Sequence, residues 1–121
     1  MKAVGYRQPL PIEHPESLLD LDLPAPAPGE HDLLVQVQAI SVNPVDTKVR
    51  KSAQPEPGQV RVLGYDAVGI VQAVGPAVTR FKPGDRVYYA GSIARPGTNA
   101  ELHAVDERIA GHAPVRRTAP P

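Results

Sequence analysis

Two short segments carry the residues best suited to chemistry in this sequence. Asn43 and Asp46 follow an apolar, strand-like run, and Tyr65 and Asp66 open a second one. Carboxylate and phenol side chains can take part in proton transfer or line a site that binds a carbonyl group. An isolated carboxylate without a basic or acidic partner is weak evidence for acid–base catalysis, so a structural interpretation of each segment stays open beside the chemical one.

The structural interpretation assigns these residues to caps and bends. Asn43 precedes a proline at the start of a stretch that predicts a short helix over residues 44–50, where Asn is a favoured N-cap and Pro a favoured first residue. Asp46 would then be a favourable charge in the first turn. Asp66 would accept hydrogen bonds from backbone donors at a bend, while Tyr65 packs its ring against the core.

Short strands must position these residues. The run Asp32–Val42 alternates apolar residues with glutamines, which predicts a strand with one packed and one partly wet face. Leu63–Gly75 is more continuously apolar, which predicts a bent strand covered on both faces, with glycines at bulges or at close approaches of another backbone. Lys82–Asp85 predicts a tight turn. With 15 prolines among 121 residues, the pattern is typical of a small all-β barrel.

The composition excludes several classes of protein. Lys and Arg balance Asp and Glu at 13 each, so no positive patch indicates binding to nucleic acid or to an anionic membrane. The absence of cysteine excludes disulfides, thiolate catalysis and cysteine-ligated zinc. No apolar run approaches the ~20 residues of a membrane span, and Met1–Tyr6 is interpreted as a strand rather than a secretion signal. We therefore expect a soluble cytoplasmic protein with one domain.

Two glycine-containing motifs in fixed order give the sequence a family resemblance. They are Gly64-x-Asp66-x-x-Gly69-x-Val71-x-x-x-Gly75 and Phe81-x-x-Gly84-Asp85-x-Val87. From residue 1 to about residue 109 the chain resembles the N-terminal, GroES-like domain of medium-chain dehydrogenase/reductases, in the branch of quinone oxidoreductases and zinc-type alcohol dehydrogenase-like proteins. The resemblance implies a mainly β fold, a partly open GroES-like barrel with one or two short helices.

The resemblance also implies a site. In this family the segment similar to Ser41–Asp46 lies under the nicotinamide ring of NADPH and lines the substrate cleft. Asn43 and Asp46 would then meet the nicotinamide or the substrate. Tyr65 and Asp66 would form the cleft floor, and Tyr88 or Tyr89 its wall.

The zinc ligands of related alcohol dehydrogenases are missing from this chain. Those enzymes bind catalytic zinc through a cysteine in the segment similar to Ser41–Asp46 and through the histidine of a Gly-His-Glu motif, where this chain has Tyr65-Asp66. A tyrosine is not a usual zinc ligand. The four histidines are scattered without ligand spacing and are interpreted as ordinary surface or strand residues: His14, His31, His103 and His112. We therefore expect no metal site and no zinc.

The end of the chain departs from the resemblance. Residues 110–121 contain three prolines and two adjacent arginines, so a disordered or non-family tail is expected after a domain of residues 1–109. No Gly-x-Gly-x-x-Gly follows a strand and opens a helix, so we expect no Rossmann domain and no site for the pyrophosphate of NADPH in this chain. These observations indicate a fragment, an engineered domain, or the product of a truncation or frameshift.

The implied function is that of a substrate-side domain in a zinc-independent NAD(P)H-dependent oxidoreductase. Such an enzyme reduces a quinone, carbonyl or activated alkene by hydride transfer, and the isolated chain is expected to be inactive. The alternative is a free-standing GroES-like assembly or interaction module, which needs an apolar anchor on a mobile loop, and Lys51–Gln59 has none. Because missing strand neighbours expose backbone and apolar surface, we also expect self-association.

Overall fold

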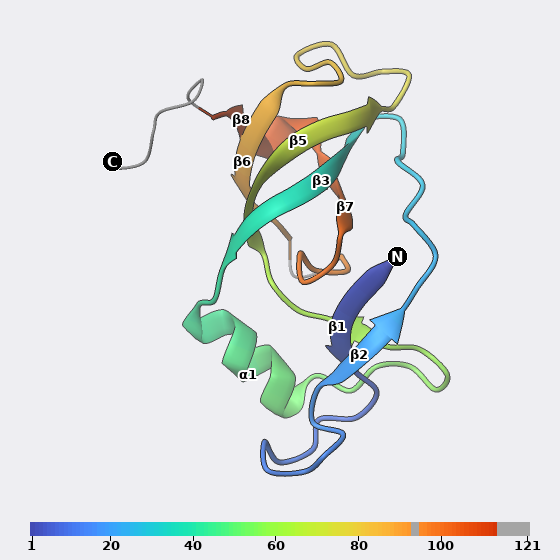
Figure 1. Ribbon diagram of the computed structural model, residues 1–121, viewed down its shortest axis with the longest axis vertical. Helices are drawn as coiled ribbons and strands as arrows, with labels where there is room; N and C mark the ends of the chain where they lie inside the picture. The colour runs from blue at the N-terminus through green and yellow to red at the C-terminus, as the bar shows by residue number, and fades with distance from the viewer. Residues whose placement is uncertain (93–94, 114–121) are drawn as a thin grey trace.

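Two antiparallel β-sheets make up most of the part of the chain that the computed structural model describes, residues 1–92 and 95–113. Sheet A has the strand order β2 (Leu19–Asp22), β1 (Lys2–Tyr6) and β4 (Arg61–Val62). Sheet B has the order β7 (Leu102–Asp106), β3 (Asp32–Ser41), β5 (Asp66–Val74), β6 (Arg86–Ala90) and β8 (Ala110–His112). The helix α1 (Pro44–Ser52) lies beside sheet A, and a 3₁₀ turn (Glu107–Ile109) joins β7 to β8 (Figure 1).

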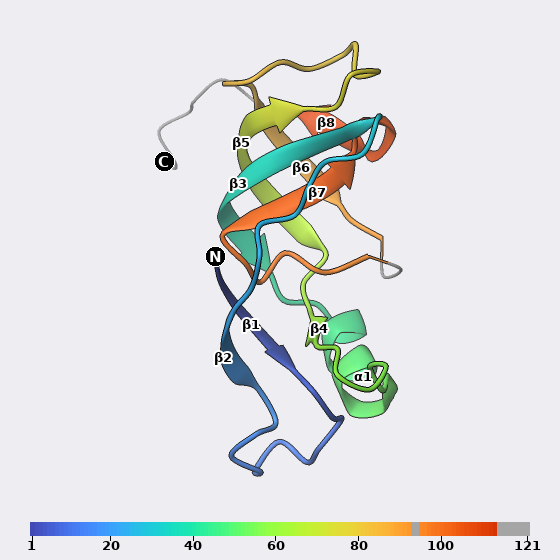
Figure 2. The ribbon, with the colours of Figure 1, turned by 90° about the vertical axis from the view of Figure 1, so that its right-hand side faces the viewer.

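The two sheets stay separate, with sheet B at one end of the molecule and sheet A with α1 at the other (Figure 2). The mainly β, partly open architecture expected from the sequence is thus confirmed, including a single short α-helix among the described residues. That part of the chain contains no helix of the length and apolar character needed to cross a membrane.

The main core lies on the inner face of sheet B. Apolar side chains on alternate positions of β3, β5, β6 and β7 are almost fully buried, among them Leu33, Val35, Val71, Val87 and Val105. Burial of each of these side chains contributes roughly 1.5–3 kcal/mol to the stability of the fold. The alternation predicted for residues 32–42 holds in the first part of β3, where Val35 is buried and Gln36 and Gln38 are exposed. It is wrong for Ala39, because the pairing shifts between Val37 and Ala39 and the strand is exposed from there to its end.

Strand β5 differs from its predicted environment. The continuous apolar run indicated two covered faces, yet only the inward face, with Ala67 and Val71, is buried, while Val68 and Ile70 on the outward face are half-exposed. The reason is that sheet B curls around a single core, and no described element packs over its outer face. The apolar outer residues instead line hollows in the surface.

The predicted close approaches at glycines are confirmed at two positions. A Cβ on Gly69 would lie 2.3 Å from the backbone oxygen of Gln36, beside an irregularity in the pairing of β3 with β5. A Cβ on Gly75 would lie 2.0 Å from the backbone oxygen of Gly29. Both contacts are with backbone, which cannot move aside, so these glycines set how tightly β5 approaches its neighbours.

The predicted tail beginning at residue 110 is wrong for its first residues. Ala110–His112 form β8, which pairs with β6 along the edge of sheet B. The His112 ring lies 4.3 Å from the Phe81 ring, centroid to centroid, and its Nε2 is 3.4 Å from Asp85 Oδ2. Edge pairing and these contacts order a segment whose own composition favours no strand, while the predicted disorder of residues 114–121 lies outside the described residues.

Helix α1 is fastened to sheet A at its C-terminal end. The Tyr6 hydroxyl lies 3.0 Å from the carbonyl oxygen of Val49 and 2.7 Å from that of Ala53, and these oxygens belong to the last turn and the C-cap. Arg50 is buried and donates from Nη1 to the Leu10 carbonyl at 2.6 Å. The Tyr6 hydroxyl thus binds carbonyl oxygens at the C-terminal end of α1. Arg50 ties the same end of the helix to the loop that contains Leu10.

Candidate functional site

The candidate site lies where four elements end close together. Strand β3 ends at Ser41, α1 begins after Asn43, β5 begins at Asp66 and β6 ends at Ala90. The pairing of sheet B places Ser41 opposite Asp66, and Asp66 opposite Ala90. Element ends supply side chains and backbone groups that the sheet and helix do not consume, so this edge of sheet B is where ligand-binding groups are available.

Asn43 and Asp66 form the polar centre of the site. Asn43 is the N-cap of α1, as predicted, and its backbone is extended at that position. Its side-chain Nδ2 donates a hydrogen bond of 2.7 Å to Asp66 Oδ2. Oδ1 of Asp66 accepts no hydrogen bond from the described residues. A carboxylate held through one oxygen and open through the other is suited to accept a hydrogen bond from a hydroxyl or amide of a ligand.

Asp46 holds the two segments of the site together. Its carboxylate is buried, with the residue only 6% exposed. Oδ2 accepts from the backbone N–H of Asn43 at 2.8 Å, and Oδ1 accepts from that of Gly64 at 3.1 Å. The predicted contact of Asp46 with nicotinamide or substrate stays a prediction, but the geometry gives this residue a bridging role between the start of α1 and the segment that leads into β5.

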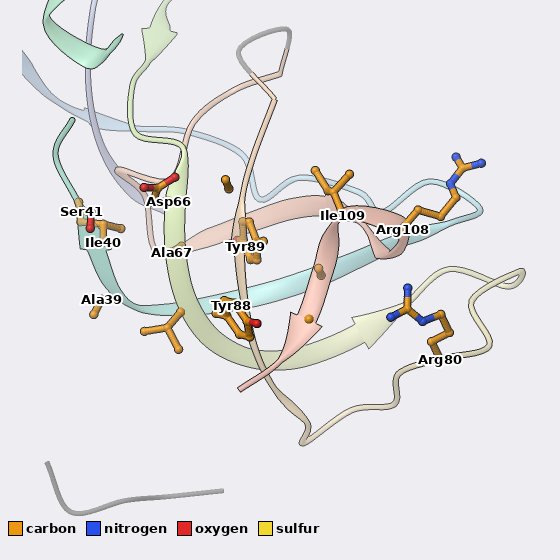
Figure 3. Close-up of a pocket in the computed structure, with 14 residues that line it drawn as sticks. Ala39, Ile40, Ser41, Asp66, Ala67, Arg80, Tyr88, Tyr89, Arg108 and Ile109 are labelled. Atoms are coloured by element: carbon orange, nitrogen blue, oxygen red, sulfur yellow. The ribbon is translucent and has the colours of Figure 1, made fainter. Parts of the chain in front are cut away.

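A surface hollow of about 650 Å³ extends from this site over sheet B and is lined by residues from both faces of its strands (Figure 3). Asp66 and Ser41 line one end, and Arg80 and Arg108 line the other. The Arg108 guanidinium is engaged by Asp106, with contacts of 2.9 Å from Nε to Oδ1 and 2.6 Å from Nη2 to Oδ2. The floor between the ends is apolar and includes Ile40, Val68, Tyr88 and Ile109.

The two adjacent tyrosines of β6 point to opposite sides of sheet B. Tyr88 faces outward into the hollow, half-exposed, and its ring lies over Gly111 of β8. Tyr89 is buried, and its hydroxyl meets His103 Nδ1 at 2.8 Å. Burial raises the pKa of the Tyr89 hydroxyl well above its usual range. Both tyrosines line the hollow, and Tyr88 is the one with the larger exposed surface.

Tyr65 lies apart from the other predicted site residues. Its side chain is buried and not among the residues that line the hollow, and its hydroxyl is 3.5 Å from Arg61 Nη2. The structure thus brings together Asn43, Asp46 and Asp66, places Tyr88 farther along the same hollow, and directs Tyr65 and Tyr89 into the interior. The predicted role of Tyr65 in the cleft floor is untested.

Three contributions to the site were not predicted from the sequence. Val42, the residue before Asn43, is 75% exposed, and its neighbours in sequence Ile40 and Val45 are exposed as well. Arg108 reaches the hollow because the 3₁₀ turn and β8 fold back along β6. Arg80, in the segment before β6, is held at the same end of the hollow because its backbone N–H donates to Glu107 Oε1 at 3.1 Å. A predicted strand after residue 109 would have indicated that Arg108 lies beside β6. The composition of that segment does not predict a strand.

The donor groups at this site do not fit a zinc ion. Asp66 offers only Oδ1, because its Oδ2 accepts from Asn43; Asp46 is occupied by two backbone N–H groups, and Tyr65 points elsewhere. Within residues 1–92 and 95–113, no three His, Cys, Asp or Glu side chains converge closely enough to hold a metal. Zinc needs a compact set of such ligands.

Comparison with known proteins identifies related sequences and folds. Residues 29–114 match the family model of the alcohol dehydrogenase GroES-like domain. A zinc-type alcohol dehydrogenase-like protein of Staphylococcus aureus (strain COL) is 48% identical over 115 residues, which cover 94% of this chain and 34% of that protein. A quinone oxidoreductase of Pseudomonas aeruginosa is 41% identical over 100 residues, which cover 83% of this chain and 30% of that protein.

Solved structures agree with these matches. A crystal structure from Rhizobium etli CFN 42, described as a candidate zinc-dependent alcohol dehydrogenase, superposes with a TM-score of 0.92 at 63% identity and covers 98% of this chain and 34% of that one. Escherichia coli quinone oxidoreductase complexed with NADPH gives a TM-score of 0.78 at 30% identity, covering 94% and 33%. The chain thus spans about a third of the length of the relatives that it matches.

Proposed function

The chain belongs to the alcohol dehydrogenase GroES-like domain family of the medium-chain dehydrogenase/reductases, and on this basis we propose that it forms the substrate-side wall of an oxidoreductase site. The enzyme would transfer hydride between NADPH and a quinone, carbonyl or activated alkene, without zinc. NADPH would supply the hydride, and this domain would orient the reacting groups and exclude water. The observation that carries the proposal is the Asn43–Asp66 pair, set beside exposed apolar residues at the end of sheet B.

The surroundings of this pair suit a flat ring. Val42, Ile40 and Val45 expose apolar surface at the junction of β3 and α1. Such surface favours a nicotinamide or quinone ring because burying it removes apolar area from water. Oδ1 of Asp66 would accept a hydrogen bond from the carboxamide NH₂ of a nicotinamide or from the hydroxyl of a reduced quinone, which fixes the orientation of the ring.

Several related proteins carry names that point to this chemistry. The Pseudomonas aeruginosa relative is named a quinone oxidoreductase, and the Escherichia coli quinone oxidoreductase structure contains NADPH. The Staphylococcus aureus relative is named zinc-type. The donor groups described above do not fit zinc, so we assign no step of the reaction to a metal.

A domain exchange tests the proposal. Residues 1–113 would replace the matching third of the Staphylococcus aureus relative, and NADPH-dependent quinone reduction would be measured for the chimera. We expect activity, with a fall of about tenfold or more in kcat/KM for Asn43→Ala and for Asp66→Ala, because each removes half of a charge-assisted hydrogen bond at the site. Asp20→Asn, an exposed change on β2, is the control.

The chain alone provides a second test. We expect no saturable binding of micromolar NADPH in a fluorescence titration, because the sequence has no glycine-rich turn opening a helix to hold the pyrophosphate. Saturable binding by the chain alone would contradict the proposal that this domain forms only the substrate-side wall of the site. A folded chimera that binds NADPH yet reduces no quinone, carbonyl or activated alkene would contradict the assignment to this reaction.

A further inference from the structure

Tyr89 and His103 form a buried polar pair that the proposed site does not use. His103 of β7 is only 5% exposed, and its ring is nearly parallel to that of Tyr89, with 5.5 Å between centroids. Its Nδ1 lies 2.8 Å from the Tyr89 hydroxyl, and its Nε2 lies 3.0 Å from the Pro96 carbonyl oxygen. One histidine thus connects β6 and β7 to the segment that precedes β7.

The hydrogen-bond partners define the protonation state of His103. A carbonyl oxygen can only accept, so Nε2 must carry a proton and donate it to Pro96. Nδ1 is then without a proton and accepts from the Tyr89 O–H. Both ring nitrogens and the Tyr89 hydroxyl are satisfied together only while the imidazole is neutral. A proton on Nδ1 would have to donate to the Tyr89 oxygen, and the hydroxyl proton, turned away from the ring, would then have no acceptor among the described residues.

The surroundings of His103 disfavour a positive charge. Burial lowers the pKa of His103, which the hydrogen bond to Pro96 only partly offsets. Arg95, in the segment before β7, lowers it further, while Asp32 of β3 raises it. These two residues pair with each other at 3.0 Å, so their effects on the ring oppose each other. Tyr89 faces the ring from β6.

The Pro96 segment is in turn bonded to the backbone beneath the candidate site. The N–H groups of Gly97, Thr98 and Asn99 donate to the carbonyl oxygens of Val62, Gly64 and Leu63, at 2.9, 2.7 and 2.9 Å respectively. A Cβ on Gly97 would lie 2.3 Å from the carbonyl carbon and oxygen of Leu63, so the two backbones are in direct contact. Residue 64 also donates to Asp46, which holds Asn43.

From this connectivity we propose that the hydrogen bonds from Tyr89 to His103 and from His103 to Pro96 form a pH-sensitive latch, a contact that is closed or open depending on the protonation of His103. While His103 is neutral, the latch holds residues 96–99 against residues 62–64 and thereby keeps Gly64 in place to donate to Asp46. When His103 becomes protonated, the latch opens and this backbone contact loosens. The proposal concerns the fold alone and does not depend on the oxidoreductase function.

The expected effect follows from proton linkage. A histidine released by opening has a pKa near its ordinary value of about 6.5, whereas the closed form resists protonation. The open form is therefore favoured as the pH falls below about 6.5, and closure is at full strength above it. Between pH 7.5 and pH 5.5 the opening equilibrium should rise about tenfold, provided that the closed form stays unprotonated.

Amide hydrogen exchange of the intact chain tests the latch. After correction for intrinsic exchange rates, the protection of the amides of residues 97–99 should fall about tenfold from pH 7.5 to pH 5.5. His103→Gln, which keeps a donor and an acceptor but does not titrate, should abolish this pH dependence. His14→Gln, a change at an exposed histidine, should leave it unchanged. Equal protection at both pH values in the wild type, or a tenfold fall that persists in His103→Gln, would overturn the proposal.

A second measurement does not require any variant to fold. ¹⁵N spectra of the imidazole rings in the wild-type chain report the tautomer and the titration of each histidine. We expect His103 in the Nε2–H form, with a titration midpoint below the ordinary histidine value of about 6.5. A midpoint at or above that value, or the Nδ1–H form, would overturn the latch.

Discussion

Removal of the Asp46 carboxylate should destabilise the whole domain. The buried carboxylate accepts two backbone hydrogen bonds, at 2.8 Å from Asn43 and 3.1 Å from Gly64. Hydrogen bonds to a charged group contribute roughly 1.5–3 kcal/mol each, and an unsatisfied buried N–H carries a desolvation cost. We therefore expect Asp46→Ala to lower the free energy of unfolding by about 3–5 kcal/mol, a large part of the roughly 5–15 kcal/mol typical of a domain.

Asp46→Asn separates the two bonds. The amide oxygen can still accept from one N–H, but the NH₂ group cannot accept from the other, so about half of the loss is expected. Urea denaturation measures both variants. With a slope of about 1–3 kcal/mol per molar urea, Asp46→Ala should lower the midpoint by roughly 1–5 M.

Asp20→Asn is the matched control for this series. Asp20 is exposed on β2, and its substitution should change the free energy of unfolding by no more than about 0.5 kcal/mol. If Asp46→Ala loses no more stability than Asp20→Asn, the bridging role assigned to the carboxylate is refuted.

Four further expectations concern other parts of the molecule. Gly97→Ala should cost several kcal/mol in thermal unfolding because its Cβ would meet the Leu63 backbone at 2.3 Å, whereas Gly111→Ala meets only the movable ring of Tyr88. Because Arg108 holds the pKa of Asp106 far below its usual range, this carboxylate stabilises the fold above about pH 4, and stability is lost as the pH falls below that value; urea midpoints should show a shallower acid loss in a variant with Asn at position 106. Purified, dialysed protein should contain no stoichiometric zinc by elemental analysis, and about one zinc per chain would contradict the donor-group argument. Light scattering with gel filtration should show a dimer or larger assembly, since sheet edges and apolar surface are exposed and net charge is zero, and a constant mass of 12.9 kDa over a hundredfold dilution would refute this.

Local rules predicted the pieces of the site but not their assembly. The cap at Asn43 and the first-turn position of Asp46 follow from helix preferences that act within four residues. The bond from Asn43 to Asp66 crosses 23 positions in sequence, and nothing in either segment specifies the other. It arises because β3 and β5 pair, which puts Ser41 opposite Asp66.

The two tyrosines of β6 show another limit of the sequence. Adjacent residues of a strand face opposite sides of its sheet, so one of Tyr88 and Tyr89 had to point inward. The residue type does not decide which of the two points inward, because a tyrosine can bury its ring or expose it. The choice follows from Val87, which is fully buried and therefore sets Tyr89 inward as well.

Strand β8 was missed because its local composition predicts no strand, and its pairing with the edge of β6 overrides that composition.

The order of strands in sheet B has a consequence for synthesis of the chain. Strand β3 pairs on one side with β5 and on the other with β7, and about 65 residues separate the end of β3 from the end of β7. At the usual 5–20 residues per second, the ribosome completes β7 roughly 3–13 s after β3. For that time one edge of the longest strand, with its backbone donors and acceptors, has no native partner. An unpaired edge of this kind can bind another nascent chain, so the yield of folded protein should fall when translation of residues 42–106 is slowed.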